Sequence, residues 1–154
     1  MNTQNVPEDI KVSLKLKLAT LWASFMFLYI YVDYFHLYMP GKIEGIQTGS
    51  VFEFDITQGF LLAALASLTI PALMIFLSVA LPAKVNRLVN IIIAAVYIPY
   101  TLFNLAGEAW MHMVFGAVVE VVLLCLIIRY AWKWPRRKKD IPNQDSLVYP
   151  FRLD

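Results

Sequence analysis

Charged side chains are scarce in this sequence of 154 residues. Aspartate, glutamate, lysine and arginine make up 16% of the chain, whereas 60% is hydrophobic and the mean hydropathy is +0.63. Since soluble domains carry about 25% charged residues, the composition indicates a protein that is surrounded by lipid. The basic residues lie in runs outside the apolar segments, so the net charge of +2 is poor evidence for nucleic-acid binding.

Cysteine and catalytic motifs are also nearly absent. The single cysteine, Cys125, excludes an intrachain disulfide and a paired-cysteine metal or redox site. We interpret it as a small apolar residue of a buried segment. The sequence contains no phosphate-binding glycine loop, no nucleophile elbow, no zinc-protease helix and no internal transporter repeat. Enzyme and transporter classes that depend on those features are therefore disfavoured.

Four apolar stretches are long enough to cross a membrane. They cover residues 18–38, 60–81, 87–105 and 109–131. About 20 apolar residues span the hydrocarbon core as a helix, and lipid offers the backbone no other hydrogen-bond partners. We therefore predict an all-α integral membrane four-helix bundle over residues 14–134. A cytoplasmic segment, 1–13, precedes it, and a basic cytoplasmic tail, 135–154, follows.

The start of the first span can be read in two ways. Residues 10–18 alternate between apolar and mostly basic or polar side chains, which by itself suggests a strand. Pro7, Glu8 and Asp9 have the composition of a helix first turn, and this favours a helix. The segment has no signal-peptide cleavage pattern, so we expect it to remain as an anchor.

The basic residues predict the orientation. Three lysines precede the first span, two basic residues lie between the second and third, and seven lie from Arg129 to Arg152; only Lys42 falls on the other side. The positive-inside rule then places both termini of this multi-pass protein in the cytoplasm. The cluster Arg136, Arg137, Lys138 and Lys139 could bind anionic lipid or simply anchor the topology.

The outer segment and two prolines leave structural alternatives open. Residues 39–59 form either an ordered loop over the bundle mouth or a flexible connection. Pro71 and Pro99 interrupt the second and third spans, and each leaves a backbone carbonyl that a neighbour must satisfy.

Glu120 is the most informative residue, since an ionisable group inside a span is costly. It lies near the middle of the fourth span with no basic residue at a comparable depth. We expect it to be protonated at neutral pH and to bond with Tyr29, Tyr97 or the backbone near Pro71.

A second polar group lies toward the expected outer side. Asp33 and His36 are three residues apart, and Glu108 and His112 are four apart, so each pair projects from one helical face. With Tyr29, Asn104 and Glu120 they could form a ligand or proton site. Asp33, His36, Glu108 and His112 are also possible metal ligands, and structural hydrogen bonding is the plainer alternative.

Several segments resemble a bacterial family of small four-span membrane proteins of unknown function. The likeness rests on Tyr31–Gly41 (YVDYFHLYMPG), Ile56–Leu62 (ITQGFLL), Leu81–Asn90 (LPAKVNRLVN) and Tyr130–Trp134 (YAWKW). It implies four spans and a multi-pass protein of the bacterial cytoplasmic (inner) membrane, but no particular activity. The layout is also loosely similar to that of DoxX-like proteins, although no motif matches.

Three functions follow, in order of preference. The first is a module that binds or transports a small ligand, proton or ion in the outer half of the bundle, either as a monomer or as a homo-oligomer. The second is a structural or accessory subunit, and the third is an intramembrane enzyme. The sequence leaves the question of a cofactor open.

Overall fold

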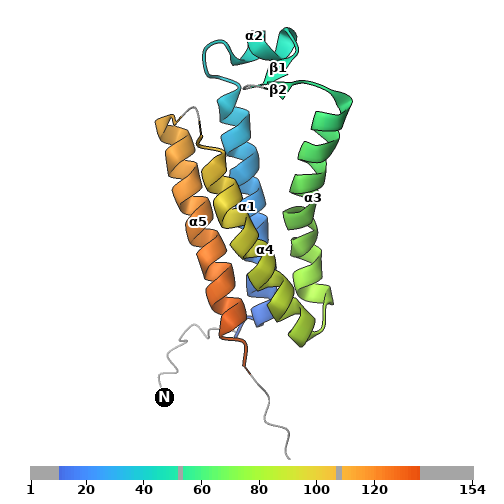
Figure 1. Ribbon diagram of the computed structural model, residues 1–154. Coiled ribbons are helices and arrows are strands. Elements are labelled where there is room, and N and C mark those ends of the chain that lie inside the picture. The colour runs from blue at the N-terminus through green and yellow to red at the C-terminus, as the bar shows by residue number, and fades with distance from the viewer. Residues whose placement is uncertain (1–10, 52–53, 107–108, 136–154) are drawn as a thin grey trace, which may run out of the picture.

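Four long helices form the body of the protein. The computed structural model describes residues 11–51, 54–106 and 109–135, which contain α1 (Leu14–His36), α2 (Lys42–Gln47), α3 (Gln58–Ala80), α4 (Ala83–Phe103) and α5 (Met111–Trp132). α1, α3, α4 and α5 are long and apolar enough to cross a membrane, and they run side by side (Figure 1). The prediction of an all-α four-helix membrane bundle is confirmed.

Hydroxyl side chains fix where two of these helices begin. The Ser13 hydroxyl accepts a hydrogen bond from the Leu16 N–H at 3.3 Å, and the Thr57 hydroxyl accepts one from the Phe60 N–H at 3.1 Å. Each bond satisfies one of the free N–H groups of a first turn. Residues 11–13 are not helical, so the apolar alternation continues into a helix from Leu14 on; the expected first turn at Pro7 lies outside the described residues.

The connection between α1 and α3 is ordered where it is described. It contains α2 and two short strands, β1 (Ser50–Val51) and β2 (Phe54–Asp55), which pair antiparallel with Ser50 opposite Asp55. Gly41 and Gly49 have φ angles of 80° and 87°, a region that favours glycine. These elements lie over one end of the bundle (Figure 1), which we call the loop end.

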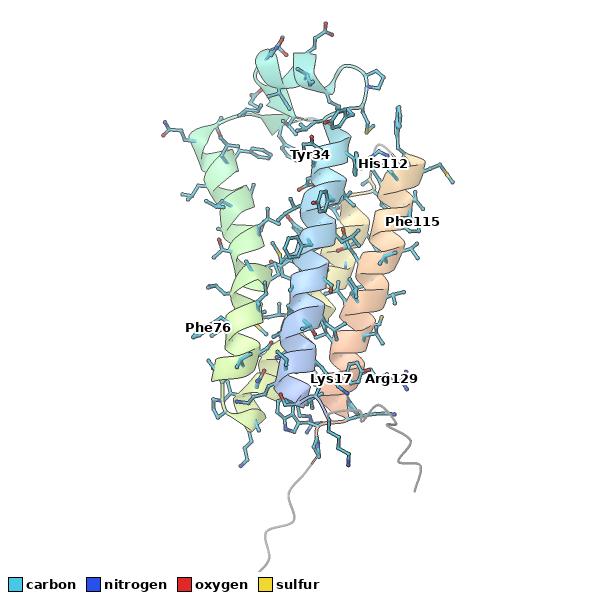
Figure 2. The ribbon with its side chains drawn as sticks, turned by 180° about the vertical axis from the view of Figure 1, so that it is seen from behind. Lys17, Tyr34, Phe76, His112, Phe115 and Arg129 are labelled. Atoms are coloured by element: carbon cyan, nitrogen blue, oxygen red, sulfur yellow. The ribbon has the colours of Figure 1, made fainter. Side chains whose placement is uncertain are left out.

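Cationic side chains collect at the opposite end, which we call the basic end. Figure 2 shows Lys17 and Arg129 there, whereas Tyr34 and His112 lie toward the loop end. Lys15 Nζ donates to the carbonyls of Val79, at 2.9 Å, and Leu81, at 2.7 Å, and so caps the last turn of α3. The described chain enters α1 and leaves α5 at this same end; which side of the membrane it faces stays a prediction.

α3 packs against the bundle mainly through one half of its length. Its buried residues are Pro71, Met74 and Ser78, all in the half nearer the basic end. The other half stands apart from α4 in Figure 1. Hydrophobic side chains on the outside, such as Phe76 on α3 and Phe115 on α5, project away from the bundle (Figure 2), as side chains in contact with lipid do. Cys125 of α5 is exposed as well, so the interpretation of this residue as buried was wrong.

The basic-end half is closed by a buried hydrogen-bond network. Trp22 Nε1 donates to Asn90 Oδ1 at 2.7 Å, Asn90 Nδ2 donates to Asn86 Oδ1 at 2.6 Å, and Asn86 Nδ2 donates to the Ser78 carbonyl at 2.5 Å. All four residues are fully buried. Interhelical bonds of this kind join helices where lipid provides little hydrophobic driving force.

Both prolines are accommodated within continuous helices. Pro71 has no N–H to give to the carbonyl of Ser67, four residues earlier. The hydroxyl of Tyr97 on α4 donates to this carbonyl instead. The neighbouring helix thus supplies the partner that the sequence requires.

α1 and α5 approach closely at Gly116. A Cβ atom at this position would overlap the Val32 side chain, so the seam between the two helices depends on the missing side chain. The contact places the loop-end half of α1 directly against α5.

Candidate functional site

Glu120 lies near the middle of α5 and is almost completely buried, with 3% of its surface exposed. The nearest lysine or arginine along its own helix, Arg129, is nine residues away, or about 13 Å along the axis. In the described parts of α1, α4 and α5, all lysines and arginines lie in turns near the basic end. The carboxyl therefore has no cationic counter-charge nearby among these helices.

Asp33 brings a second carboxyl toward Glu120. It lies on α1 toward the loop end, close enough to act electrostatically on both the Glu120 carboxyl and the Tyr29 hydroxyl. Unlike Glu120, Asp33 is exposed. One acid thus lies at the accessible margin of the site, and the other lies inside it.

Amide and hydroxyl groups border the two acids. Asn104 Nδ2 donates to the Tyr29 hydroxyl at 2.9 Å, and the Tyr29 and Tyr100 hydroxyls also interact. The Tyr100 hydroxyl lies 3.1 Å from Ser67 Oγ on α3. This chain of polar side chains connects α1 with α4 and with the freer half of α3.

Thr101 is the functional candidate that sequence reasoning missed. It is 1% exposed, and its hydroxyl oxygen has no hydrogen-bond partner of regular geometry among the described residues. This hydroxyl lies beside the Glu120 carboxyl and acts on it. The available signal was helical spacing, since Asn90, Ala94, Tyr97 and Thr101 form the buried face of α4.

The sequence-based partners of Glu120 are only partly found. Tyr97 is committed to the Ser67 carbonyl, which Pro71 leaves free, and therefore does not serve Glu120 as its hydroxyl donor. Tyr29 instead joins the site through Asp33 and Asn104. Thr101 occupies the position beside the carboxyl that was assigned to these groups.

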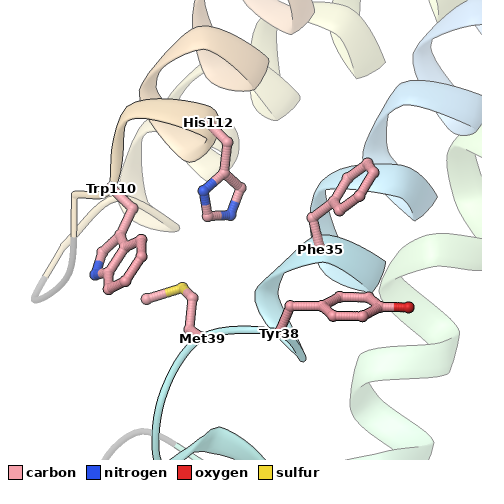
Figure 3. A pocket seen from close by; sticks show the side chains of 5 residues that line it. All are labelled: Phe35, Tyr38, Met39, Trp110 and His112. Atoms are coloured by element: carbon pink, nitrogen blue, oxygen red, sulfur yellow. The ribbon is translucent and has the colours of Figure 1, made fainter.

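His112, which was expected at the same site, lines a hollow at the loop ends of α1 and α5. The hollow has a volume of about 390 Å³, and its other lining residues are Phe35, Tyr38, Met39 and Trp110 (Figure 3). The imidazole is packed edge-on to Trp110, and its Nε2 atom is buried without a partner among the described residues. Neither Glu120 nor Asp33 lines this hollow.

The metal prediction receives no support from the described residues. No group of three or more histidine, cysteine or acidic side chains is close enough there to hold a metal ion. Glu108 lies outside the described residues, and His36 is half-buried on α1. The basic cluster from Arg136 to Lys139 also lies outside them, so lipid binding by it stays a prediction.

The arrangement of spans and loops agrees with one known family. Residues 9–141 match the family of unknown function DUF6326. The chain belongs to this family. The match covers all four long helices and the connections between them, and it carries no activity with it. The chain matches no curated protein and no solved structure.

Proposed function

We propose that this member of the DUF6326 family binds and exchanges a proton or small cation at Glu120, in the loop-end half of the bundle. The observation that carries the proposal is a buried carboxyl beside a second carboxyl, without a lysine or arginine nearby in the described helices. A carboxylate in a low-dielectric interior requires a proton or a cation to neutralise it.

The surroundings of Glu120 favour exchange over a purely structural role. A structural polar network is saturated, as that of Trp22, Asn86 and Asn90 is. Around Glu120, by contrast, the Thr101 hydroxyl has no hydrogen-bond partner of regular geometry among the described residues, and Asp33 is exposed. The exposed acid provides a route by which a cation reaches the buried one, because a carboxylate at an entrance raises the local cation concentration.

The direction of exchange follows from the predicted topology. If the basic end faces the cytoplasm, Asp33 opens the site toward the outside. The packed layer around Trp22 and Phe25 then separates it from the cytoplasm. Such a module would serve as a carrier or as an ion-responsive subunit of a larger assembly, and a homo-oligomer is compatible with either.

Infrared difference spectroscopy tests the ionisation of Glu120. The full-length protein is measured in lipid nanodiscs in choline chloride buffer, and the wild type is compared with Glu120→Gln. We expect a protonated carbonyl band at pH 7 that is missing from the variant. Glu44→Gln, which changes an exposed acid on α2, is the matched control and should retain the band. A carboxylate band of Glu120 at pH 7 would overturn the proposal.

Proteoliposomes test whether binding leads to exchange. A pH gradient is imposed, and an enclosed pH-sensitive dye records how fast it decays. The wild type should dissipate the gradient faster than Glu120→Gln, whereas Glu44→Gln should behave as the wild type does. Equal rates in all three proteins would contradict transport and favour an accessory role.

A further inference from the structure

We propose that Glu120 and Thr101 together bind a small monovalent cation of the sodium class, in competition with a proton. This inference rests on the proposed function, because it identifies the ion that the same carboxyl takes when it is not protonated. It stands on the buried hydroxyl of Thr101, which lies beside the Glu120 carboxyl and has no hydrogen-bond partner of regular geometry among the described residues.

The buried hydroxyl oxygen of Thr101 is available to bind a ligand. Its hydroxyl oxygen is inaccessible, has no hydrogen-bond partner of regular geometry among the described residues, and lies beside the Glu120 carboxyl. Buried hydroxyls in native proteins are nearly always paired, since desolvation without a partner costs free energy. A hydroxyl oxygen also has two lone pairs, so it can coordinate a cation that the carboxylate attracts.

The chemistry of the site selects a hard cation. The polar groups around it are the carboxyl and hydroxyl oxygens of Glu120, Thr101, Asp33 and Tyr29, and the side-chain oxygen of Asn104 remains available because its nitrogen binds Tyr29. Oxygen ligands suit alkali and alkaline-earth cations, whereas softer metals prefer imidazole and thiolate. His112 lies in the aromatic hollow with Trp110, away from this oxygen group.

Charge and burial further restrict which cation can bind at this site. Glu120 is a single buried carboxyl, and one positive charge neutralises it; the exposed Asp33 retains its own contact with the surroundings. Glu120 and Thr101 are only 3% and 1% exposed, so a cation bound between them has to lose most of its water, which favours a small ion over an organic cation. A monovalent ion of sodium size meets both conditions.

The same pair of groups accounts for competition with a proton. When Glu120 is protonated, its O–H can donate to the Thr101 oxygen. When it is ionised, its carboxylate and the same Thr101 oxygen can hold the cation. In each state the charge of the Glu120 carboxyl is neutralised, and both states use the same carboxyl and hydroxyl oxygens. Binding of one cation must therefore accompany loss of one proton.

The test adds sodium to the infrared experiment on the full-length protein in nanodiscs. At constant pH and ionic strength, sodium chloride replaces choline chloride. In the wild type we expect the protonated carbonyl band of Glu120 to decrease and a carboxylate band to appear, with sodium more effective than potassium. In Thr101→Val, which keeps the shape and removes the hydroxyl, the half-saturating sodium concentration should rise by about tenfold or more.

Controls separate this inference from the proposed function. Thr69→Val removes an exposed hydroxyl on α3 that bonds only within its own helix, and it should respond to sodium as the wild type does. If the Glu120 band responds to pH but not to sodium, the cation site is refuted and proton binding stands. If Thr101→Val retains the wild-type sodium response, Thr101 is not a ligand, and the inference is also refuted. A band that responds to neither pH nor sodium overturns both.

Discussion

Both halves of this bundle contain buried polar side chains, but the two halves differ in how fully these groups are hydrogen-bonded. Toward the basic end, Trp22, Asn86 and Asn90 hydrogen-bond to one another across helices, and all are fully buried. Toward the loop end, Glu120 has no counter-charge among the described helices and Thr101 has no hydrogen-bond partner of regular geometry there. A saturated network stabilises a fold, whereas an unsaturated one has binding capacity left for a ligand.

The packing of α3 follows the same division. Its buried residues all lie in the basic-end half, where Met74 of α3 joins the core that contains Trp22 of α1. Beyond Pro71, Ser67 is the point where α4 reaches α3, through Tyr97 and Tyr100. The loop-end half of the bundle, which carries Glu120 and Asp33, is therefore the half in which α3 is packed least tightly.

Replacing Asn90 with leucine should have the largest effect on stability. The change leaves the Trp22 indole N–H and the Asn86 amide oxygen without a side-chain partner, and we expect a loss on the order of 2 kcal/mol. Thermal unfolding in detergent, followed by tryptophan fluorescence, measures it. Glu120→Gln, in the other half, should lose far less. Equal losses would abolish the distinction between a structural network and a ligand site.

Gly116→Ala tests whether the loop-end half is loosely packed only at α3 or also at the contact between α1 and α5. The new Cβ overlaps Val32, so we expect a loss of about 1 to 2 kcal/mol, typical of overpacking. Gly59→Ala, at a position with only ordinary contacts, is the matched control. The double variant Gly116→Ala with Val32→Ala should recover part of the loss. A stability equal to that of Gly59→Ala would show that the α1–α5 seam is not tight.

The Tyr97 hydroxyl provides the smallest and most specific test. Tyr97→Phe removes the hydroxyl that donates to the Ser67 carbonyl, which Pro71 leaves without a helical N–H partner. We expect the free energy of unfolding to fall by about 1 kcal/mol. In a Pro71→Ala background the carbonyl regains a helical N–H, so the same change should cost much less. A double-mutant cycle measures this coupling. Additive losses would mean that the hydroxyl does not serve the proline.

The span pattern could be predicted almost completely from the sequence, and the site only in part. Hydropathy over 20 residues sets the helices, whereas the N-caps Ser13 and Thr57, where two of them begin, were not among the sequence predictions. Glu120, Asp33, Tyr29 and Asn104 were recognised because polar residues in spans are rare. Thr101 was not recognised, because a single threonine is common in membrane helices and its importance depends on what it faces.

The histidines illustrate the remaining limit. The spacing of His112 along the chain indicates which helix face it occupies, but not whether that face turns toward Asp33 or toward Trp110. The packing of α5 against α1, which approach closely at Gly116, decides this, because it depends on how side chains of different helices fit together.

By itself, the sequence determined that four segments must be helices in lipid and that the carboxyl at position 120 would need protection, because backbone and charge have few alternatives in hydrocarbon. The tertiary structure alone decided which polar groups share a space. Helix rotation and crossing arise from interhelical packing, which a linear pattern of hydropathy does not encode. The pairing of Thr101 with Glu120, and of Tyr97 with the proline of another helix, belongs to that second category.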